Sequence, residues 1–204
     1  IAAELAAVQE RKLRDLSRKV KDIDPATLSD AALAALRRLD TKRLPLVKGK
    51  PRIGACVAGS GKFVAIGLNF VYHAKETGSP IPAHPIIFFK TTNCIQGPND
   101  PVMQPKDSTQ LDYEVELGIV IGRTCRAVSE EEAQAAIFGY TCINDVTAAE
   151  LLNRDATFAQ WTRAKSFDTF GVFGPVIATG LDPMTLSIRT VLNDQERQNY
   201  PVAD

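Results

Sequence analysis

One stretch of the chain, residues 111–122, indicates both a class of structure and a kind of site: Leu111-Asp112-Tyr113-Glu114-Val115-Glu116-Leu117-Gly118-Ile119-Val120-Ile121-Gly122. Side chains alternate between the two faces of a strand, so Asp112, Glu114 and Glu116 share one face. Neighbouring carboxylates repel one another and resist ionisation unless a cation neutralises them. A Mg²⁺ ion held by carboxylate oxygens would supply that charge. The spacing leaves two interpretations open, a divalent-metal site or an amphipathic edge strand with a solvated acidic face.

Short apolar runs separated by glycine and proline predict further strands on both sides of this stretch. The expected strands are Arg52–Val57, Phe63–Gly67, Ile86–Lys90, Tyr113–Ile121, Gly139–Ile143, Val172–Ala178 and Leu186–Leu192. Helices are expected at Ser129–Ile137 and around Ala148–Gln160. Ser129 and Glu132 have the spacing of a capping box. Many strands with few long helices favour an α+β, β-rich fold over a βαβ repeat.

A glycine-rich tetrad, Gly59-Ser60-Gly61-Lys62, lies between the first two of these expected strands. A phosphate-binding loop has four residues between its first glycine and the Gly-Lys pair, and a helix follows it. Neither condition holds here, so the tetrad is interpreted as a hairpin turn between the strands at 52–57 and 63–67.

Residues 1–50 are predicted to form a helical N-terminal region. Apolar residues recur every three to five positions and form one stripe of Leu5, Val8, Leu13, Leu16, Val20 and Ile23. Ser29 is the expected N-cap of a second helix. Basic residues between Arg11 and Lys21 are interleaved with acidic ones, which favours a solvated helix face over a nucleic-acid patch.

Charge and composition exclude several classes of protein. The chain has 24 Lys+Arg against 24 Asp+Glu, so no net positive field would attract a nucleic acid. Its apolar runs are too short to span a bilayer, and no signal peptide is visible. The cysteines are too widely spaced for a zinc cluster, and buried free thiols are expected at Cys56, Cys94, Cys125 and Cys142. Free thiols indicate a reducing compartment, so a cytoplasmic protein with no nucleic-acid or membrane partner is predicted.

Three further groups of residues are candidates for chemistry. Asp145 follows the expected strand at Gly139–Ile143 and would add a third carboxylate. His73 and Glu76 are three residues apart, so on one helical turn they form either a general-base pair or a structural surface pair. Lys165 lies among aromatic residues and is either a desolvated cation that stabilises a developing oxyanion or a lysine at the edge of the core. Each residue taken alone leaves its alternatives open.

In combination, these segments resemble the fumarylacetoacetate hydrolase family. The matching segments, in the order of the family, are Ile66–Phe70 with His73 and Glu76, Pro85–Lys90, Gly97-Pro98, Asp112–Leu117, Gly139–Thr147, and Lys165–Phe170 with Gly174-Pro175. The similarity begins near residue 50, so residues 51–204 would be a catalytic domain of this type behind the helical region of residues 1–50. The resemblance implies a mixed β-sandwich roll, usually in a homodimer, whose C-terminal part is expected to be missing from this chain.

The resemblance also implies roles for the candidate residues. The implied ligands of a divalent metal are Glu114, Glu116 and Asp145. The metal would be Mg²⁺ or Mn²⁺, with Ca²⁺ as an alternative. His73 and Glu76 would form a proton-transfer dyad on a mobile lid, and Lys165 would be the active-site cation.

The chemistry of the family implies a small-molecule substrate, a 2-oxo or 1,3-dicarbonyl acid from the catabolism of aromatic compounds or organic acids. Two substrate oxygens would chelate the metal, which acts as a Lewis acid and stabilises an enolate. C–C hydrolysis, decarboxylation and isomerisation all begin in this way, so the type of reaction stays open. The alternative is a non-catalytic or truncated module of the family that keeps the metal pocket for binding or assembly.

Overall fold

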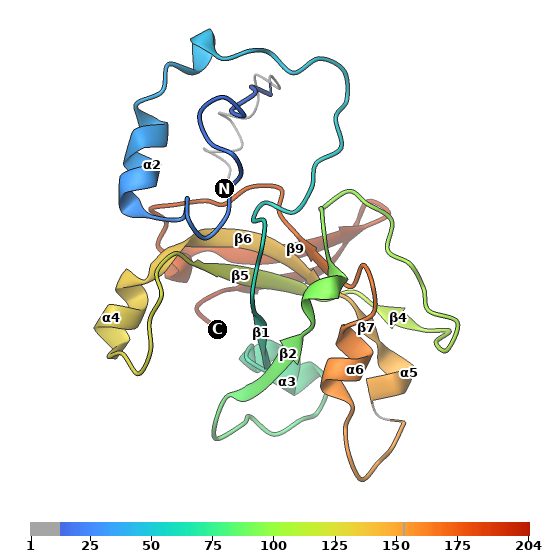
Figure 1. Ribbon diagram of the computed structural model, residues 1–204. Helices are drawn as coiled ribbons and strands as arrows, with labels where there is room; N and C mark the ends of the chain where they lie inside the picture. Colours follow the sequence, from blue (N-terminus) through green and yellow to red (C-terminus); the bar gives the residue numbers. More distant parts are fainter. Residues whose placement is uncertain (1–12, 153) are drawn as a thin grey trace.

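The computed structural model describes residues 13–152 and 154–204, and a four-stranded sheet lies at its centre (Figure 1). The order of strands across this sheet is β3 (Ile95–Gln96), β8 (Gly171–Phe173), β6 (Ile137–Asp145) and β5 (Val115–Ile121). β6 is antiparallel to both β5 and β8, and β3 is parallel to β8. β5 lies at the edge of the sheet, and exposure alternates at its end, where Ile119 and Ile121 share an exposed face and Val120 is partly buried on the other.

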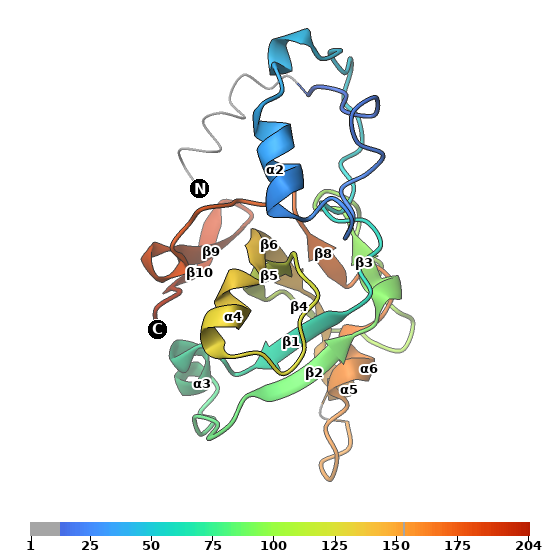
Figure 2. The same cartoon turned by 60° about the vertical axis from the view of Figure 1, so that its left-hand side comes forward.

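Three pairs of antiparallel strands complete the sheet structure of the described residues. They are β1 (Phe63–Gly67) with β2 (Ile86–Lys90), β4 (Leu111–Asp112) with β7 (Thr147–Ala148), and β9 (Ser187–Leu192) with β10 (Gln195–Pro201). The turn residues Asn193 and Asp194 between β9 and β10 both have positive φ, a geometry that matches the twist of a tight hairpin. Figure 2 shows β1 and β2 side by side, with α3 (Val71–Glu76) at one end of the pair and α6 (Trp161–Lys165) beside β2.

The remaining helices in the described part of the chain are short. They are α2 (Asp30–Arg37), α4 (Glu130–Ala135) and α5 (Ala149–Leu152), with 3₁₀ turns η2 (Thr41–Arg43), η3 (Thr92–Cys94) and η4 (Pro183–Thr185). The predicted capping box is confirmed, because the Ser129 hydroxyl accepts the Glu132 N–H at 3.2 Å and the Glu132 carboxylate accepts the Ser129 N–H at 2.8 Å. Ser29 is also confirmed as the N-cap of α2, where it accepts the Ala32 N–H at 3.2 Å.

Within residues 1–50, the structure confirms the helix after Ser29, but a helix over residues 13–24 is wrong; residues 1–12 lie outside the described residues. Turns and an isolated bridge between Arg14 and Leu46 take the place of the helix. Nearby backbone N–H groups donate at 2.8–3.0 Å to the carboxylates of Asp15, Asp22 and Asp24. Such local acceptors compete with helical hydrogen bonds, which explains why the apolar stripe was misleading. A boundary at residue 50 stays a prediction.

The strand predicted at Arg52–Val57 is wrong, and so is the hairpin turn at Gly59–Lys62. The segment is irregular, and β1 pairs with β2 instead. Its backbone passes so close to Gly97 that a Cβ at this position would collide with the Ile53 carbonyl oxygen. This segment is therefore held by close packing against Gly97, the residue after β3, and not by a ladder of strand hydrogen bonds.

The helix predicted at Ala148–Gln160 is divided, because α5 ends at Leu152 and α6 begins at Trp161. Between them the Asp155 carboxylate accepts hydrogen bonds from the N–H and the hydroxyl of Thr157, at 2.9 and 2.6 Å, and forms a turn. The strands predicted at Phe63–Gly67 and Ile86–Lys90 are confirmed with the same ends, and the other predicted strands are present with shifted ends. The strand predicted at Val172–Ala178 differs most, since β8 ends at Phe173.

Two apolar clusters form the interior. One contains Cys94, Val146, Ala148, Leu151, Ala164 and Phe170, and the other contains Leu28, Val57 and Phe173. In the first cluster, Val146 follows the last residue of β6 and Ala164 precedes the last residue of α6. Packing of this cluster therefore brings the ends of β6 and α6 together, which positions Asp145 near Lys165.

Two expectations from composition have structural outcomes. The four cysteines are free thiols, as predicted, although only Cys94 is buried. In the part of the chain that the structure describes, no helix has the length and apolar character needed to cross a bilayer.

Gly97→Ala is expected to destabilise the fold by about 1–3 kcal/mol, the usual cost of adding atoms to a well-packed position. The new Cβ would collide with the Ile53 carbonyl oxygen, as the packing around β3 leaves no space. Urea unfolding followed by circular dichroism measures the change. Gly61→Ala is the matched control, because nothing lies within 4 Å of a Cβ at Gly61. Equal stability of the two variants would contradict the close approach at Gly97.

Candidate functional site

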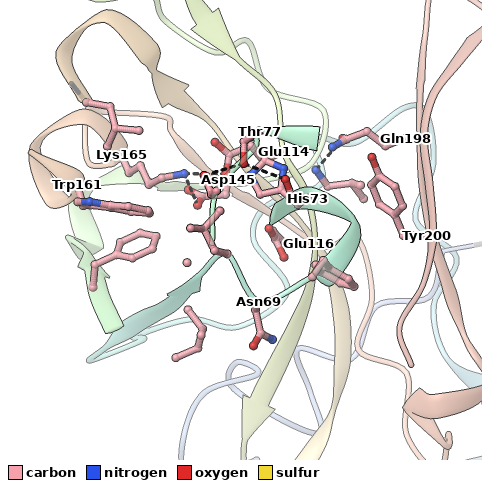
Figure 3. A pocket seen from close by; sticks show the side chains of 18 residues that line it. Asn69, His73, Thr77, Glu114, Glu116, Asp145, Trp161, Lys165, Gln198 and Tyr200 are labelled. Atoms are coloured by element: carbon pink, nitrogen blue, oxygen red, sulfur yellow. Dashed lines mark hydrogen bonds and ion pairs between the residues drawn. The ribbon is translucent and has the colours of Figure 1, made fainter. Parts of the chain in front are cut away.

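A cavity of about 380 Å³ lies between the end of β1, helices α3 and α6, strand β5 and the β9–β10 hairpin (Figure 3). The ionisable side chains in its wall are His73, Glu114, Glu116, Asp145, Lys165 and Tyr200. Five of these six were predicted from the sequence, and they come from four separate elements. The fold therefore brings most of the predicted site residues together in one place.

The pairing of β5 with β6 makes Glu114 and Asp145 neighbours. Val115 lies opposite Asn144, and one residue further the Asp145 N–H donates to the Glu114 carbonyl at 2.9 Å. The Asn144 side chain accepts the Glu114 N–H at 3.1 Å and holds the chain just before β5. Glu116 is two residues after Glu114, so it points to the same face. The register of two strands thus gathers three carboxylates.

Lys165, the last residue of α6, places its ammonium between these carboxylates. Its Nζ lies 2.7 Å from Oε2 of Glu114 and 2.8 Å from Oδ2 of Asp145, and it donates to the Thr147 hydroxyl at 2.7 Å. Only 3% of the side chain is exposed. Burial lowers the pKa of Lys165, but the charges of Asp145 and Glu114 outweigh that effect and raise it. Lys165 is therefore a desolvated cation in the cavity wall and not a lysine that reaches from the core into water.

A second buried lysine, Lys90 at the end of β2, completes this network and was not predicted from the sequence. Its Nζ lies 2.5 Å from Oδ1 of Asp145 and also donates to the backbone carbonyls of Val146 and Lys165. Burial lowers the pKa of Lys90, and the neighbouring Asp145 opposes the shift. Lys90 connects the ends of β2, β6 and α6. The only signal in the sequence is a lysine that ends an apolar strand.

Glu116 differs from the other two carboxylates in its lack of a partner. Thr147 donates to Oε1 of Glu114 at 2.6 Å and both lysines bind Asp145, whereas the described residues donate no hydrogen bond to the Glu116 carboxylate. Burial and the nearby charges of Asp145 and Glu114 raise the pKa of Glu116 to about 8, against the opposing effect of Lys165. A carboxylate in this environment is stabilised by a proton or by an added cation.

Two predicted acidic residues lie elsewhere. Asp112 is exposed and outside the cavity, because the chain leaves the extended pattern between β4 and β5 and the predicted alternation stops there.

His73 and Glu76 both lie on α3, as predicted, and His73 is in the cavity wall. Glu76 is exposed, lies outside that wall, and has the Tyr200 phenol beside it. Catalysis by a His73–Glu76 dyad stays a prediction.

Much of the remaining wall is apolar. Its larger apolar residues are Ile66, Leu68, Phe70, Phe88, Leu152 and Trp161. The Phe88 and Trp161 rings are 5.3 Å apart, and the Lys165 ammonium lies 5.5 Å from the centre of the Phe88 ring. Trp161 packs so closely on β1 that a Cβ at Gly67 would be 2.7 Å from its ring. A cavity with one charged side and one apolar side suits a small ligand with a polar head.

The three carboxylates are the kind of donors that Mg²⁺ and Ca²⁺ prefer. Between residues 13 and 204, residue 153 excepted, no three His, Cys, Asp or Glu side chains stand close enough to share one metal ion. The Lys165 ammonium lies between two of the acids, Glu114 and Asp145. The three acids suit a divalent cation in the chemistry of their oxygen donors, though not in their spacing, because they line one cavity and Glu116 has no partner of its own.

Comparison with known proteins gives two kinds of match. Residues 62–204 match a sequence family described as fumarylacetoacetate (FAA) hydrolase, C-terminal. A protein of Burkholderia lata that is named as a hydrolase is 46% identical over 192 residues, which cover 92% of this chain and 67% of that protein.

Solved structures agree with the sequence matches. A 5-carboxymethyl-2-hydroxymuconate delta-isomerase from Mycobacterium smegmatis is 39% identical with a TM-score of 0.66, over 78% of this chain and 63% of that one. A fumarylacetoacetate hydrolase from Exiguobacterium antarcticum is 31% identical with a TM-score of 0.73, over 93% of this chain and 68% of that one. This chain thus spans 63–68% of the length of these three relatives.

Lys90→Met is expected to destabilise the fold by about 3–5 kcal/mol, the usual cost of removing one partner of a buried ion pair. The variant keeps a side chain of similar length but leaves Oδ1 of Asp145 without its ammonium. Denaturant unfolding measures the loss. Lys62→Met, at an exposed position, is the control and should change stability by no more than about 0.5 kcal/mol. A similarly small effect at Lys90 would mean that the buried network contributes little.

Glu116→Gln is expected to stabilise the metal-free protein, and the gain should grow as pH rises. The folded-state pKa of about 8 lies above the ordinary value of 4.5, so ionisation of Glu116 penalises the fold increasingly between these two pH values. Glutamine carries no charge and avoids this penalty. Thermal unfolding in EDTA at about pH 4 and about pH 9 measures the difference. Glu131→Gln on the exposed face of α4 is the control, and a gain at Glu116 that did not depend on pH would contradict the assignment.

Proposed function

The chain belongs to the fumarylacetoacetate hydrolase family, and from this we propose that it acts on small 2-oxo or 1,3-dicarbonyl acids. Members of the family are hydrolases, isomerases and decarboxylases, and the predicted β-rich α+β fold is confirmed by the structural matches. One observation carries the proposal: the cavity gathers three carboxylates, a buried lysine and a histidine against an apolar wall. With a divalent cation held by the three carboxylates, this composition would suit an acid whose negative charge increases during the reaction.

Glu114, Glu116 and Asp145 would hold a divalent metal, most simply Mg²⁺ or Mn²⁺, with Ca²⁺ as an alternative. Enzymes of the family generally use divalent metals. When bound, the ion would supply a Lewis acid for the oxygen atoms of the substrate. The partnerless carboxylate of Glu116 supports this assignment, because an added cation would offset the repulsion between it and the other two acids.

The remaining side chains of the cavity have roles that follow from their positions. The imidazole of His73, half-buried in the wall, would take or return a proton at the substrate carbon, or activate a water molecule. The Lys165 ammonium would orient Glu114 and Asp145 and stabilise negative charge on the substrate. The apolar wall around Trp161 would exclude water from the remainder of the substrate.

The type of reaction depends on which bond of the substrate breaks or moves. Hydrolysis, isomerisation and decarboxylation therefore all stay within this proposal. Similarity to an isomerase that is named for a hydroxymuconate supports acids of this class as candidate substrates. A role in the catabolism of aromatic compounds or organic acids, a homodimeric assembly and a cytoplasmic location stay predictions.

Glu116→Ala is expected to lower the affinity for Mn²⁺ by about 10- to 100-fold or more, because one of three carboxylate ligands is lost. Isothermal titration calorimetry measures the affinity without any need for a substrate. Glu131→Ala removes an exposed carboxylate from α4 and should leave the affinity unchanged. Unchanged Mn²⁺ binding in Glu116→Ala would refute the metal site.

A panel of oxaloacetate, acylpyruvates and hydroxymuconate-type acids, assayed with Mg²⁺, tests the activity itself. We expect turnover of at least one of these acids, and a loss of about 10²- to 10⁴-fold in His73→Ala, the range typical of a general acid–base group. Metal binding without turnover of any acid would favour the alternative of a non-catalytic binding or assembly module.

A further inference from the structure

The β9–β10 hairpin forms the side of the cavity opposite Lys165 and Trp161 (Figure 3). Gln198 and Tyr200 are two residues apart on β10, so both side chains point toward the cavity and both line it. No motif in the sequence predicts a role for either residue. Gln198 contacts the acidic strand β5 and Tyr200 contacts helix α3, two parts of the site that lie far from this hairpin in the sequence.

Gln198 connects the hairpin to β5. Its side-chain oxygen accepts the Val115 N–H at 3.3 Å and the Thr190 hydroxyl at 2.8 Å. Val115 lies between Glu114 and Glu116, so this contact fixes the hairpin directly against the two carboxylates on that strand.

Tyr200 connects the same hairpin to α3. Its ring stacks on Tyr72 with a centroid distance of 5.6 Å and an interplanar angle of 23°, and it lies 6.4 Å from the Phe70 ring. Tyr72 and Phe70 are at the beginning of α3, immediately before His73. The phenol also lies beside Glu76 in the last turn of the helix. One side chain therefore contacts both ends of α3.

A backbone contact strengthens this connection. Helix α3 lacks a side-chain cap of its own, because its N-cap residue is Phe70. The Asp204 carboxylate, just beyond β10, accepts the Tyr72 N–H at 2.7 Å and satisfies one of the free N–H groups of the first turn. The cap of α3 therefore comes from a residue that follows β10, not from the helix itself.

Helix α3 needs such contacts. It has six residues, of which only Ala74 is buried, and a helix of this length is not stable alone in water. Without the hairpin, little would hold the imidazole of His73 at the cavity.

We propose that Tyr200 is a positioning residue that fastens α3 to the β9–β10 hairpin, and thereby sets His73 and Glu76 relative to the carboxylates on β5. The part of this proposal that concerns the placement of α3 does not depend on the proposed function, whereas the part that concerns catalysis rests on it. Burial and the Glu76 carboxylate raise the pKa of Tyr200 to about 12, so the phenol keeps its proton at neutral pH. The ring provides the stacking contact, and the hydroxyl group lies beside the Glu76 carboxylate.

Amide hydrogen exchange tests the placement of α3 without any need for activity. In Tyr200→Ala, exchange in residues 71–77 should accelerate by about tenfold or more, while Tyr200→Phe keeps the ring and should keep most of the protection. Val191→Ala, at an exposed position of the same hairpin, is the control and should leave α3 unchanged. Exchange rates in β9 and β10 equal to those of the wild type would show that the hairpin is folded in the Tyr200→Ala variant. Unchanged protection of α3 in that variant would overturn the proposal.

Kinetics with an acid turned over by the wild type tests the catalytic part. Tyr200→Phe should lower kcat by about tenfold with little change in KM, as expected for a group that positions a proton-transfer residue. Affinity for Mn²⁺ should stay at the wild-type value, because the carboxylates remain in place. Tyr140→Phe, which removes a phenol outside the cavity, is the matched control. Wild-type kcat in Tyr200→Phe would refute the role of the hydroxyl, whereas a wild type inactive on the whole panel would refute the proposed function and leave the exchange result valid.

Discussion

The arrangement of the site depends on the charge balance around Asp145. Its two carboxylate oxygens bind the ammonium groups of Lys90 and Lys165, and all three side chains are almost fully buried. Taking these charges out of water is costly, so the network is stable only while every member keeps its partners. Each member ends a different element, β2, β6 or α6, and the apolar cluster behind them packs those ends together. Loss of one charge would therefore disturb three elements at once.

The same balance explains why this cavity suits a cation. Three acids face two lysines, so one acid has no positive partner, and Glu116 is the acid that pairs with neither lysine. Glu114 shares Lys165 with Asp145 and receives the Thr147 hydroxyl. An added positive charge would thus act mainly on Glu116, while the lysines continue to hold Asp145. The same small set of charges therefore serves structural stability and ligand binding. Asp145, paired with both lysines, stabilises the fold, and Glu116 is the acid left for an added cation.

Features carried by neighbouring residues could be predicted from the sequence, and features that depend on distant partners could not. The capping box of Ser129 and Glu132 lies within one helical turn, and its prediction was correct. The acids of β5 were recognised by their alternation, and Asp145, His73 and Lys165 by their place in a familiar order of motifs. Lys90 was missed because its partner is 55 residues away and nothing local distinguishes it from any lysine at the end of a strand. The stripe of residues 13–24 was misleading for the opposite reason, since aspartate side chains bind the nearby backbone and prevent the helix.

By itself, the sequence determined the family, the β-rich class of the fold and most of the charged residues in the cavity, because these are expressed in composition, periodicity and the order of short motifs. Only the tertiary structure decided which acids come together and what surrounds them. The break in the extended chain between β4 and β5 separates Glu114 and Glu116 from the exposed Asp112, although all three have the same spacing in the strand pattern. Tyr200 lies next to α3 only because the chain returns as a hairpin more than a hundred residues later. Burial, pairing and charge balance are properties of contacts between distant segments, and a linear pattern does not contain them.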